Sequence, residues 1–240
     1  KLVTGVQTCA LPISHAAGLL GDDRRELPGG ELIAPYLQDV TEKVVQLVDI
    51  AVQGLQPVTI CYGQGRCDLA ANRDYWDQAS QQFVCGYNPL GEVDETVLVG
   101  RVDDAEGCTL ATVVNYACHP TTLSWDNQQI SPDYPGAMRE VVEEATGVPC
   151  MFIQGAAGDV GPKEGFVGDV EIADRNGRQL GYAALSARTA LPAAGKRFEY
   201  AGPVISGATL GTWHYVPLSA ESLQQCQHWQ LRRLTVPLAY

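Results

Sequence analysis

The sequence predicts an α/β fold in which helices flank a mixed sheet, within a truncated single domain. Three observations favour this class. An amphipathic helical segment leads directly into a short strand, two β-branched runs are joined by a turn signal, and a second helical segment is followed at once by an apolar run. Helices that alternate with strands in this way are typical of α/β proteins. No internal repeat or low-complexity linker divides the chain, so we expect one domain.

The first helix is predicted over 29–55, where apolar residues recur at steps of three and four. They are Ile33, Leu37, Val40, Val44, Leu47, Val48, Ala51 and Leu55. A short strand over 58–62 follows and leads into a Gly-Gln-Gly turn. The next segment, 66–92, is rich in Asn, Asp, Gln and Gly. Because long polar loops are often functional, we expect this segment to lie over a cleft.

Two strands joined by a hairpin turn are expected at 96–102 and 109–117, where β-branched residues dominate. Gly107, in the connection, tolerates a positive φ. A helix over 135–145 is expected next, followed by a run at 150–154 that is apolar up to its last residue. Such a run indicates a buried central strand.

A third helix is predicted over 170–191, because Pro192 cannot continue it. The last 45 or so residues are predicted to be rich in strands, as judged from their turn and strand signals. The run 234–240 predicts a strand with no turn or cap after it, so we expect a C-terminal truncation. At the other end, 3–13 (VTGVQTCALPI) resembles a translated sequencing-library adapter. We therefore expect residues 1–14 to be an artefact and exclude them from the fold.

Composition excludes several classes of function. The 16 Lys and Arg residues face 28 Asp and Glu residues, which gives a net charge of −12, and no basic run is present. Such a chain is unsuited to a phosphate backbone, so we predict no nucleic-acid partner. No window approaches the roughly 20 apolar residues that span a bilayer, so no transmembrane segment is expected. The eight cysteines form no CxxC pair and are predicted to be mostly buried free thiols. Compartment and oligomeric state stay open.

His119 is the most informative of the four histidines. It follows the predicted strand, and the carboxyl end of a sheet strand is where α/β enzymes place reactive groups. A neutral imidazole there can ligate zinc through one nitrogen while an acceptor orients the other. A histidine bonded to a backbone carbonyl fits the same position. Cys118 does not form a local dyad with it, because adjacent residues of a strand point to opposite faces.

Two polar segments offer further candidates. The glycine-rich turn 155–162 lets backbone approach a ligand, but no helix opens from its last glycine, so nucleotide binding is disfavoured. Asp159 in this turn is a candidate general base or acceptor for a metal-ligating histidine, and capping its own turn is equally open. In the polar loop, Asn72 and Arg73 are candidates for binding an anionic or carbonyl oxygen, although a solvated arginine is more common.

Three segments carry a family resemblance: 114–122, 130–136 and 152–162, with the sequences VNYACHPTT, ISPDYPG and FIQGAAGDVGP. In order and spacing they resemble the catalytic domain of the neutral/alkaline (non-lysosomal) ceramidase family. Two shorter segments also match. The sequence SHAAG at 14–18 resembles the end of that family's histidine-rich motif, and AANR at 70–73 resembles its Asn-Arg substrate loop.

The resemblance implies that 15–240 is a partial ceramidase-like catalytic domain. It implies a zinc-dependent hydrolase that cleaves the N-acyl amide bond of a lipid or small molecule by metal-activated water. His15 and His119 match the family's zinc-ligating histidines, and the remaining ligands, a glutamate and a tyrosine, are expected beyond Tyr240. Two histidines alone would bind zinc weakly, because a catalytic zinc usually has three protein ligands.

The same resemblance assigns substrate binding to Asn72 and Arg73, and leaves Asp159 as the candidate for moving the proton. One departure keeps a second function open. The family places a serine where this chain has Gly161. This favours the alternative of a non-catalytic ligand-binding or interaction domain on the same scaffold, since a fold does not fix a function.

Overall fold

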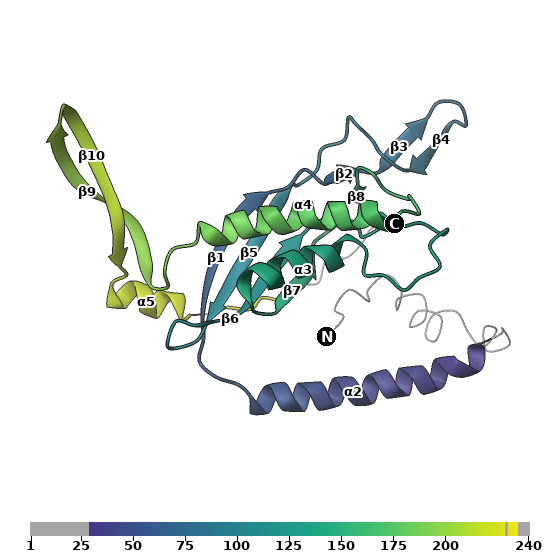
Figure 1. Cartoon of the computed structure of the whole chain (residues 1–240), viewed down its shortest axis with the longest axis horizontal. Coiled ribbons are helices and arrows are strands. Elements are labelled where there is room, and N and C mark those ends of the chain that lie inside the picture. Colours follow the sequence, from purple (N-terminus) through teal and green to yellow (C-terminus); the bar gives the residue numbers. More distant parts are fainter. Residues whose placement is uncertain (1–28, 229, 235–240) are drawn as a thin grey trace. The chain divides into compact units, whose positions relative to one another are not determined.

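The computed structural model describes residues 29–228 and 230–234. They divide into two compact units, and the division lies between Leu191 and Pro192. The first unit holds a sheet with its helices, and the second holds a β-hairpin and a short helix (Figure 1). The segment 1–14 and His15 lie outside the described residues. Within these ranges no helix combines the length and apolarity needed to cross a membrane.

The first unit is built on a four-stranded mixed sheet with the order β1-β5-β6-β7. Its strands are β1 (Thr59–Arg66), β5 (Thr96–Asp103), β6 (Thr109–Tyr116) and β7 (Cys150–Gln154). β5 pairs antiparallel with β1 and with β6, whereas β6 and β7 run parallel. The helices are α2 (Ile33–Gln53), preceded by the short turn η2 (Gly30–Leu32), then α3 (Tyr134–Thr146) and α4 (Val170–Thr189). The predicted fold class, α/β with a mixed sheet and flanking helices, is confirmed.

Local sequence signals explain where these elements begin and end. Gly107 turns the chain between β5 and β6 with a φ of 83°. The Asp133 carboxylate caps the start of α3 by accepting a hydrogen bond from the Tyr134 backbone N–H. The helix ends at Gly147, which has a φ of 70° and donates to the carbonyl of Glu143. These positive φ values favour glycine, because a side chain would be strained there.

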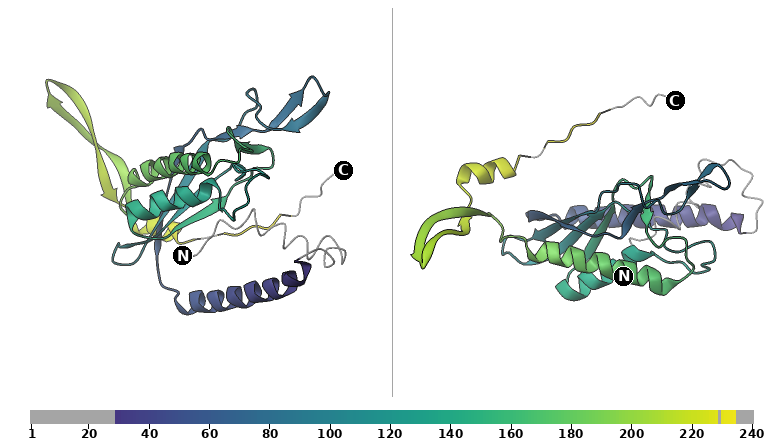
Figure 2. Two further views of the ribbon diagram at one scale, coloured as in Figure 1. Left: turned by 45° about the vertical axis from the view of Figure 1, so that its right-hand side comes forward. Right: turned by 90° about the horizontal axis from the view of Figure 1, so that it is seen from above.

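The core lies between one face of the sheet and the helices α3 and α4, which pack side by side on it (Figure 2). Strand side chains alternate between faces, so every second residue points toward the helices. Those buried from the sheet include Val97, Val99, Val114, Tyr116 and Cys150, and those from the helices include Met138, Val142, Leu180 and Ala184.

α3 and α4 approach each other closely at Gly177. A Cβ atom built there would lie 2.3 Å from the carbonyl oxygen of Tyr134 and 2.8 Å from the backbone nitrogen of Met138. A second glycine of α4, Gly181, faces Val141 in the same way, with a Cβ–Cβ distance of 2.8 Å. The two helices therefore depend on the absence of side chains at these positions.

Three details differ from the sequence-based expectations. The first strand continues to Arg66, because its glycines are extended and not turned. The segment 66–92 is not a plain loop, since it contains β2 (Ala70–Asn72), β3 (Asp74–Asp77) and β4 (Gln82–Cys85). β7 is an edge strand among the described residues, and Met151 and Ile153 are exposed. The prediction of a central strand was wrong because an apolar run does not reveal the neighbours of a strand.

The second unit consists of the antiparallel strands β9 (Lys196–Ser206) and β10 (Ala208–Pro217), followed by α5 (Ala220–Cys226). Gly207 forms the turn with a φ of 70°. Aromatic rings gather on this hairpin, where Phe198 stacks on Trp213 with a centroid distance of 5.9 Å. The expected strand-rich C-terminal segment is confirmed for the described residues, with a helix added.

The cysteines are less buried than expected. The described ones are all free, but only Cys67, Cys118 and Cys150 are buried, whereas Cys85, Cys108 and Cys226 are exposed. Burial raises the pKa of each of the three buried thiols, for Cys150 to about 12. The thiolate is the reactive form, so these thiols combine low access with low reactivity.

We therefore expect native alkylation to separate the cysteines into two groups. A short pulse of iodoacetamide at about pH 8, near the pKa of a free thiol, should modify the exposed group and spare the buried one. Peptide mapping by mass spectrometry gives the modified fraction at each site, and the same pulse in guanidinium provides the fully labelled reference. Rapid native labelling of Cys118 would contradict the packing at the end of β6.

Candidate functional site

The candidate site lies where β6 and β7 end. Because these strands are parallel, their carboxyl ends meet at one edge of the sheet. The chain leaves β6 toward His119 and leaves β7 into the glycine-rich turn. Two backbone hydrogen bonds join the exits: Gly155 N–H donates to Tyr116 O at 2.9 Å, and His119 N–H donates to Val160 O at 3.0 Å.

A small two-stranded sheet brings the polar loop to the same place. β2 pairs antiparallel with β8 (Val160–Pro162), and Asn72 lies opposite Val160. The next residue, Arg73, donates its backbone N–H to the carbonyl of Asp159 at 2.9 Å. Segments nearly 90 residues apart in the sequence are thereby held in register.

The side chains of these segments also contact one another. Asn72 Nδ2 donates to Asp159 Oδ2 at 3.2 Å, and Arg73 Nη2 donates to Gly158 O at 2.7 Å. Asp159 is exposed, whereas Asn72, Arg73 and His119 are half-buried. The structure thus brings together every sequence-predicted site residue that it describes. The remaining candidate, His15, lies outside the described residues.

The surroundings of His119 favour its neutral form. Burial lowers the pKa of the imidazole below its ordinary value, the Arg73 guanidinium lowers it further, and the Asp133 carboxylate partly opposes both. A neutral imidazole has a free nitrogen lone pair, which a metal ion requires. The environment is therefore compatible with the predicted ligand role.

The described residues do not complete a metal site. Residues 29–228 and 230–234 contain no group of three His, Cys, Asp or Glu side chains placed to hold a metal ion. A catalytic zinc usually takes three protein ligands. His119 is one candidate ligand with a suitable environment, and zinc binding stays a prediction that requires further ligands.

Two polar side chains that the sequence did not single out, the buried Tyr116 and the half-buried Gln154, support the site. The Tyr116 hydroxyl donates to Cys67 O at 2.7 Å and accepts from Ala70 N–H at 2.9 Å, which holds the approach to Asn72 against β6. Gln154 Nε2 donates to Cys118 O at 3.0 Å, beside His119. Tyr116 and Gln154 are paired in the β6–β7 register. The only sequence signal for Tyr116 and Gln154 was that each is a polar residue at the end of a largely apolar strand.

Gly161, where the ceramidase family has a serine, differs from that family in its side chain and does not require a different backbone. A Cβ atom built there would lie 3.5 Å from Thr121 Oγ1 and 3.8 Å from Arg73 Cδ, which are ordinary contact distances. The site therefore has room for a Cβ atom at this position, next to Arg73.

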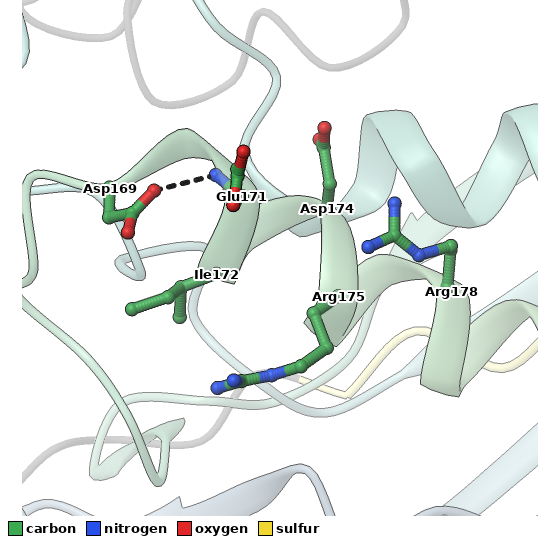
Figure 3. A pocket seen from close by; sticks show the side chains of 6 residues that line it. All are labelled: Asp169, Glu171, Ile172, Asp174, Arg175 and Arg178. Atoms are coloured by element: carbon green, nitrogen blue, oxygen red, sulfur yellow. Dashed lines mark hydrogen bonds between the residues drawn. The ribbon is translucent and has the colours of Figure 1, made fainter.

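Two pockets lie near these elements. One of about 420 Å³ is lined partly by the segment 66–92, including Arg66, Ala71 and Asn88, in keeping with the cleft expected there. Another, of about 700 Å³, lies at the start of α4 (Figure 3). Its lining combines acidic and basic side chains, namely Asp169, Glu171, Asp174, Arg175 and Arg178, together with Ile172. None of the predicted site residues lines either pocket.

No family model matches the sequence, and no curated protein matches it. Among solved structures, a ceramidase complexed with C2 is similar with a TM-score of 0.45 and 20% identity, over 62% of this chain and 26% of that chain. The neutral ceramidase from Pseudomonas aeruginosa is similar with a TM-score of 0.44 and 18% identity, over 65% of this chain and 28% of that chain. The chain thus spans little more than a quarter of the length of these solved structures.

Proposed function

We propose that this chain belongs to a hydrolase that cleaves a linear N-acyl amide bond, with zinc as cofactor and a lipid or small-molecule amide as substrate. The observation that carries the proposal is the meeting of Asn72, Arg73, His119 and Asp159 at the carboxyl ends of β6 and β7. α/β enzymes bind their substrates at such an edge. The resemblance of these segments to the ceramidase family supports an amide bond as the target.

Each residue has a role suited to its contacts. Arg73 uses one guanidinium nitrogen to hold Gly158, so its other donors are available for the carbonyl oxygen of the substrate. Asn72 orients the exposed carboxylate of Asp159, which we assign as the general base. His119 is assigned as a zinc ligand. Zinc, when bound, supplies a Lewis acid for the carbonyl and lowers the pKa of a water molecule.

Alanine at position 73 is expected to raise the KM for an N-acyl amide by about 10- to 100-fold, because a charge-assisted hydrogen bond to the substrate is lost. The measurement is fatty-acid release from a short-chain N-acyl sphingoid by a zinc-loaded protein that contains this chain together with the remaining ligands. Arg178→Ala removes an exposed arginine of α4 and serves as the matched control. An unchanged KM in Arg73→Ala, with active wild type, would show that Arg73 does not bind substrate.

A second function, non-catalytic binding on the same scaffold, is favoured by Gly161, which leaves no side chain where the family has a serine. The same assay separates the two functions. Saturable binding of the amide without turnover, at full zinc loading, would replace hydrolysis by binding as the function.

A further inference from the structure

The face of the sheet opposite α3 and α4 is largely apolar, although the polar residues Gln64 and Asn115 share a row with Leu98 and Ile153. The pairing register places Tyr62, Gly100, Val113 and Met151 in one row across all four strands. The rows on either side add Ile60, Val102 and Ala111, and Leu98 and Ile153. Several of these side chains are highly exposed: Tyr62 at 66%, Met151 at 54%, Leu98 at 48% and Ile153 at 45%. We call these nine residues the open face.

Such a face is unusual for this kind of sheet. Antiparallel pairs such as β1–β5 and β5–β6 commonly leave one face to water, but that face is then polar, and parallel strands such as β6 and β7 are normally buried on both sides. Here α3 and α4 cover the same side, since the buried side chains of β5 and β6, such as Val97, Val99 and Val114, alternate with those of the open face, whose one buried member in these two strands is Gly100. The open face therefore needs a second apolar layer.

α2 presents a surface of the matching kind. None of its residues is buried, although most of its apolar side chains form one stripe along it, with Val45, Ile50 and Val52 outside the stripe. Val44 is 52% exposed, Leu47 47% and Val48 54%. The opposite side is polar and carries the exposed pair of Lys43 and Asp39, with a nitrogen–oxygen distance of 2.6 Å. A helix with an apolar stripe and a charged opposite side is built to pack on a core.

The connection and the dimensions also fit. Only residues 54–58 separate α2 from β1, the edge strand that carries Tyr62. A helix-to-strand link of this length is usual between elements that are neighbours in space. Five residues reach about 17 Å, which is comparable to the roughly 14 Å width of four strands. Gly100 and Ala111 have small side chains or none, so the middle of the open face is recessed and leaves space for a helix.

We propose that α2 packs its apolar stripe on the open face, so that a helical layer covers each side of the sheet. The occupant is thus a segment of the same chain. This inference does not rest on the proposed catalytic function.

Photo-crosslinking from the open face provides the test. Benzoylphenylalanine at position 62 retains an aromatic ring, and irradiation is expected to join it to peptides within 33–55 in the monomer. The same group at Tyr182, an exposed tyrosine of α4 that is 62% accessible, should give no such product. Mixing isotopically light and heavy protein identifies products between copies. Cross-links formed only between copies, or none to 33–55, would overturn the proposal.

A pair of substitutions gives an independent readout. Leu47→Asp places a carboxylate in the stripe and is expected to lower the Tm by about 5 °C or more. Gln46→Asp makes the same change on the polar side and should leave the Tm within about 1–2 °C. Equal melting temperatures for the two variants would contradict docking of the stripe, whichever cross-links form.

Discussion

The His119→Ala variant is expected to lose zinc binding and amide hydrolysis together, while its fold is retained. The imidazole is half-buried at the end of β6, and its backbone N–H bond to Val160 survives the substitution. Removing one of about three protein ligands leaves too few to hold a catalytic zinc. In a protein that also contains the remaining ligands, we therefore expect zinc content to fall from about one ion per chain to near zero, and turnover to fall by at least about 1,000-fold.

Elemental analysis of the purified variant measures the first effect, and fatty-acid release measures the second. His214→Ala is the matched control, because His214 lies in β10, in the other compact unit. It should keep both zinc and activity. Full activity in His119→Ala, at unchanged zinc content, would refute the ligand assignment. A loss of activity with zinc retained would make His119 a group that acts on the substrate instead.

The elements that the sequence predicted well are those defined by local signals. The amphipathic period marked α2, and Gly107 marked a hairpin turn that requires a positive φ. The hairpin β5–β6 followed from its β-branched runs. Each of these features depends on residues within one turn or one strand, so a single sequence suffices to find it.

The site was harder to predict because its assembly is not local. Asn72 and Asp159 meet through the pairing of β2 with β8, two strands of three residues each. Strands of three residues are too short to show an alternating pattern. The sequence of neither segment indicates which other strand it pairs with. The residues were chosen by their chemistry and by the family resemblance. The supporting contacts of the Tyr116 hydroxyl with Cys67 and Ala70 depend on the same non-local packing.

Gly177→Ala is expected to destabilise the first unit by about 2 kcal/mol, and to lower the Tm by roughly 4–8 °C. The added methyl group would meet the Tyr134 carbonyl and the Met138 backbone nitrogen, at 2.3 and 2.8 Å. Both atoms belong to the backbone of α3, so relief requires a shift of the whole helix and not a rotamer change. The higher helix propensity of alanine opposes this loss by stabilising the helix by only about 1 kcal/mol.

Ser186→Ala provides the control for Gly177→Ala, because it adds no atom and lies on the exposed side of the same helix. Thermal unfolding followed by circular dichroism should show that the free energy of unfolding of Ser186→Ala is within about 0.5 kcal/mol of wild type.

The Gly177→Ala substitution should also affect the candidate site. Tyr134 begins α3 and its hydroxyl donates to the carbonyl of Cys118, the residue before His119. A displaced α3 therefore moves the chain that carries His119, and we expect the KM for the amide to rise together with the loss of stability. A Gly177→Ala variant at least as stable as wild type would mean that α3 and α4 are farther apart than the structure places them.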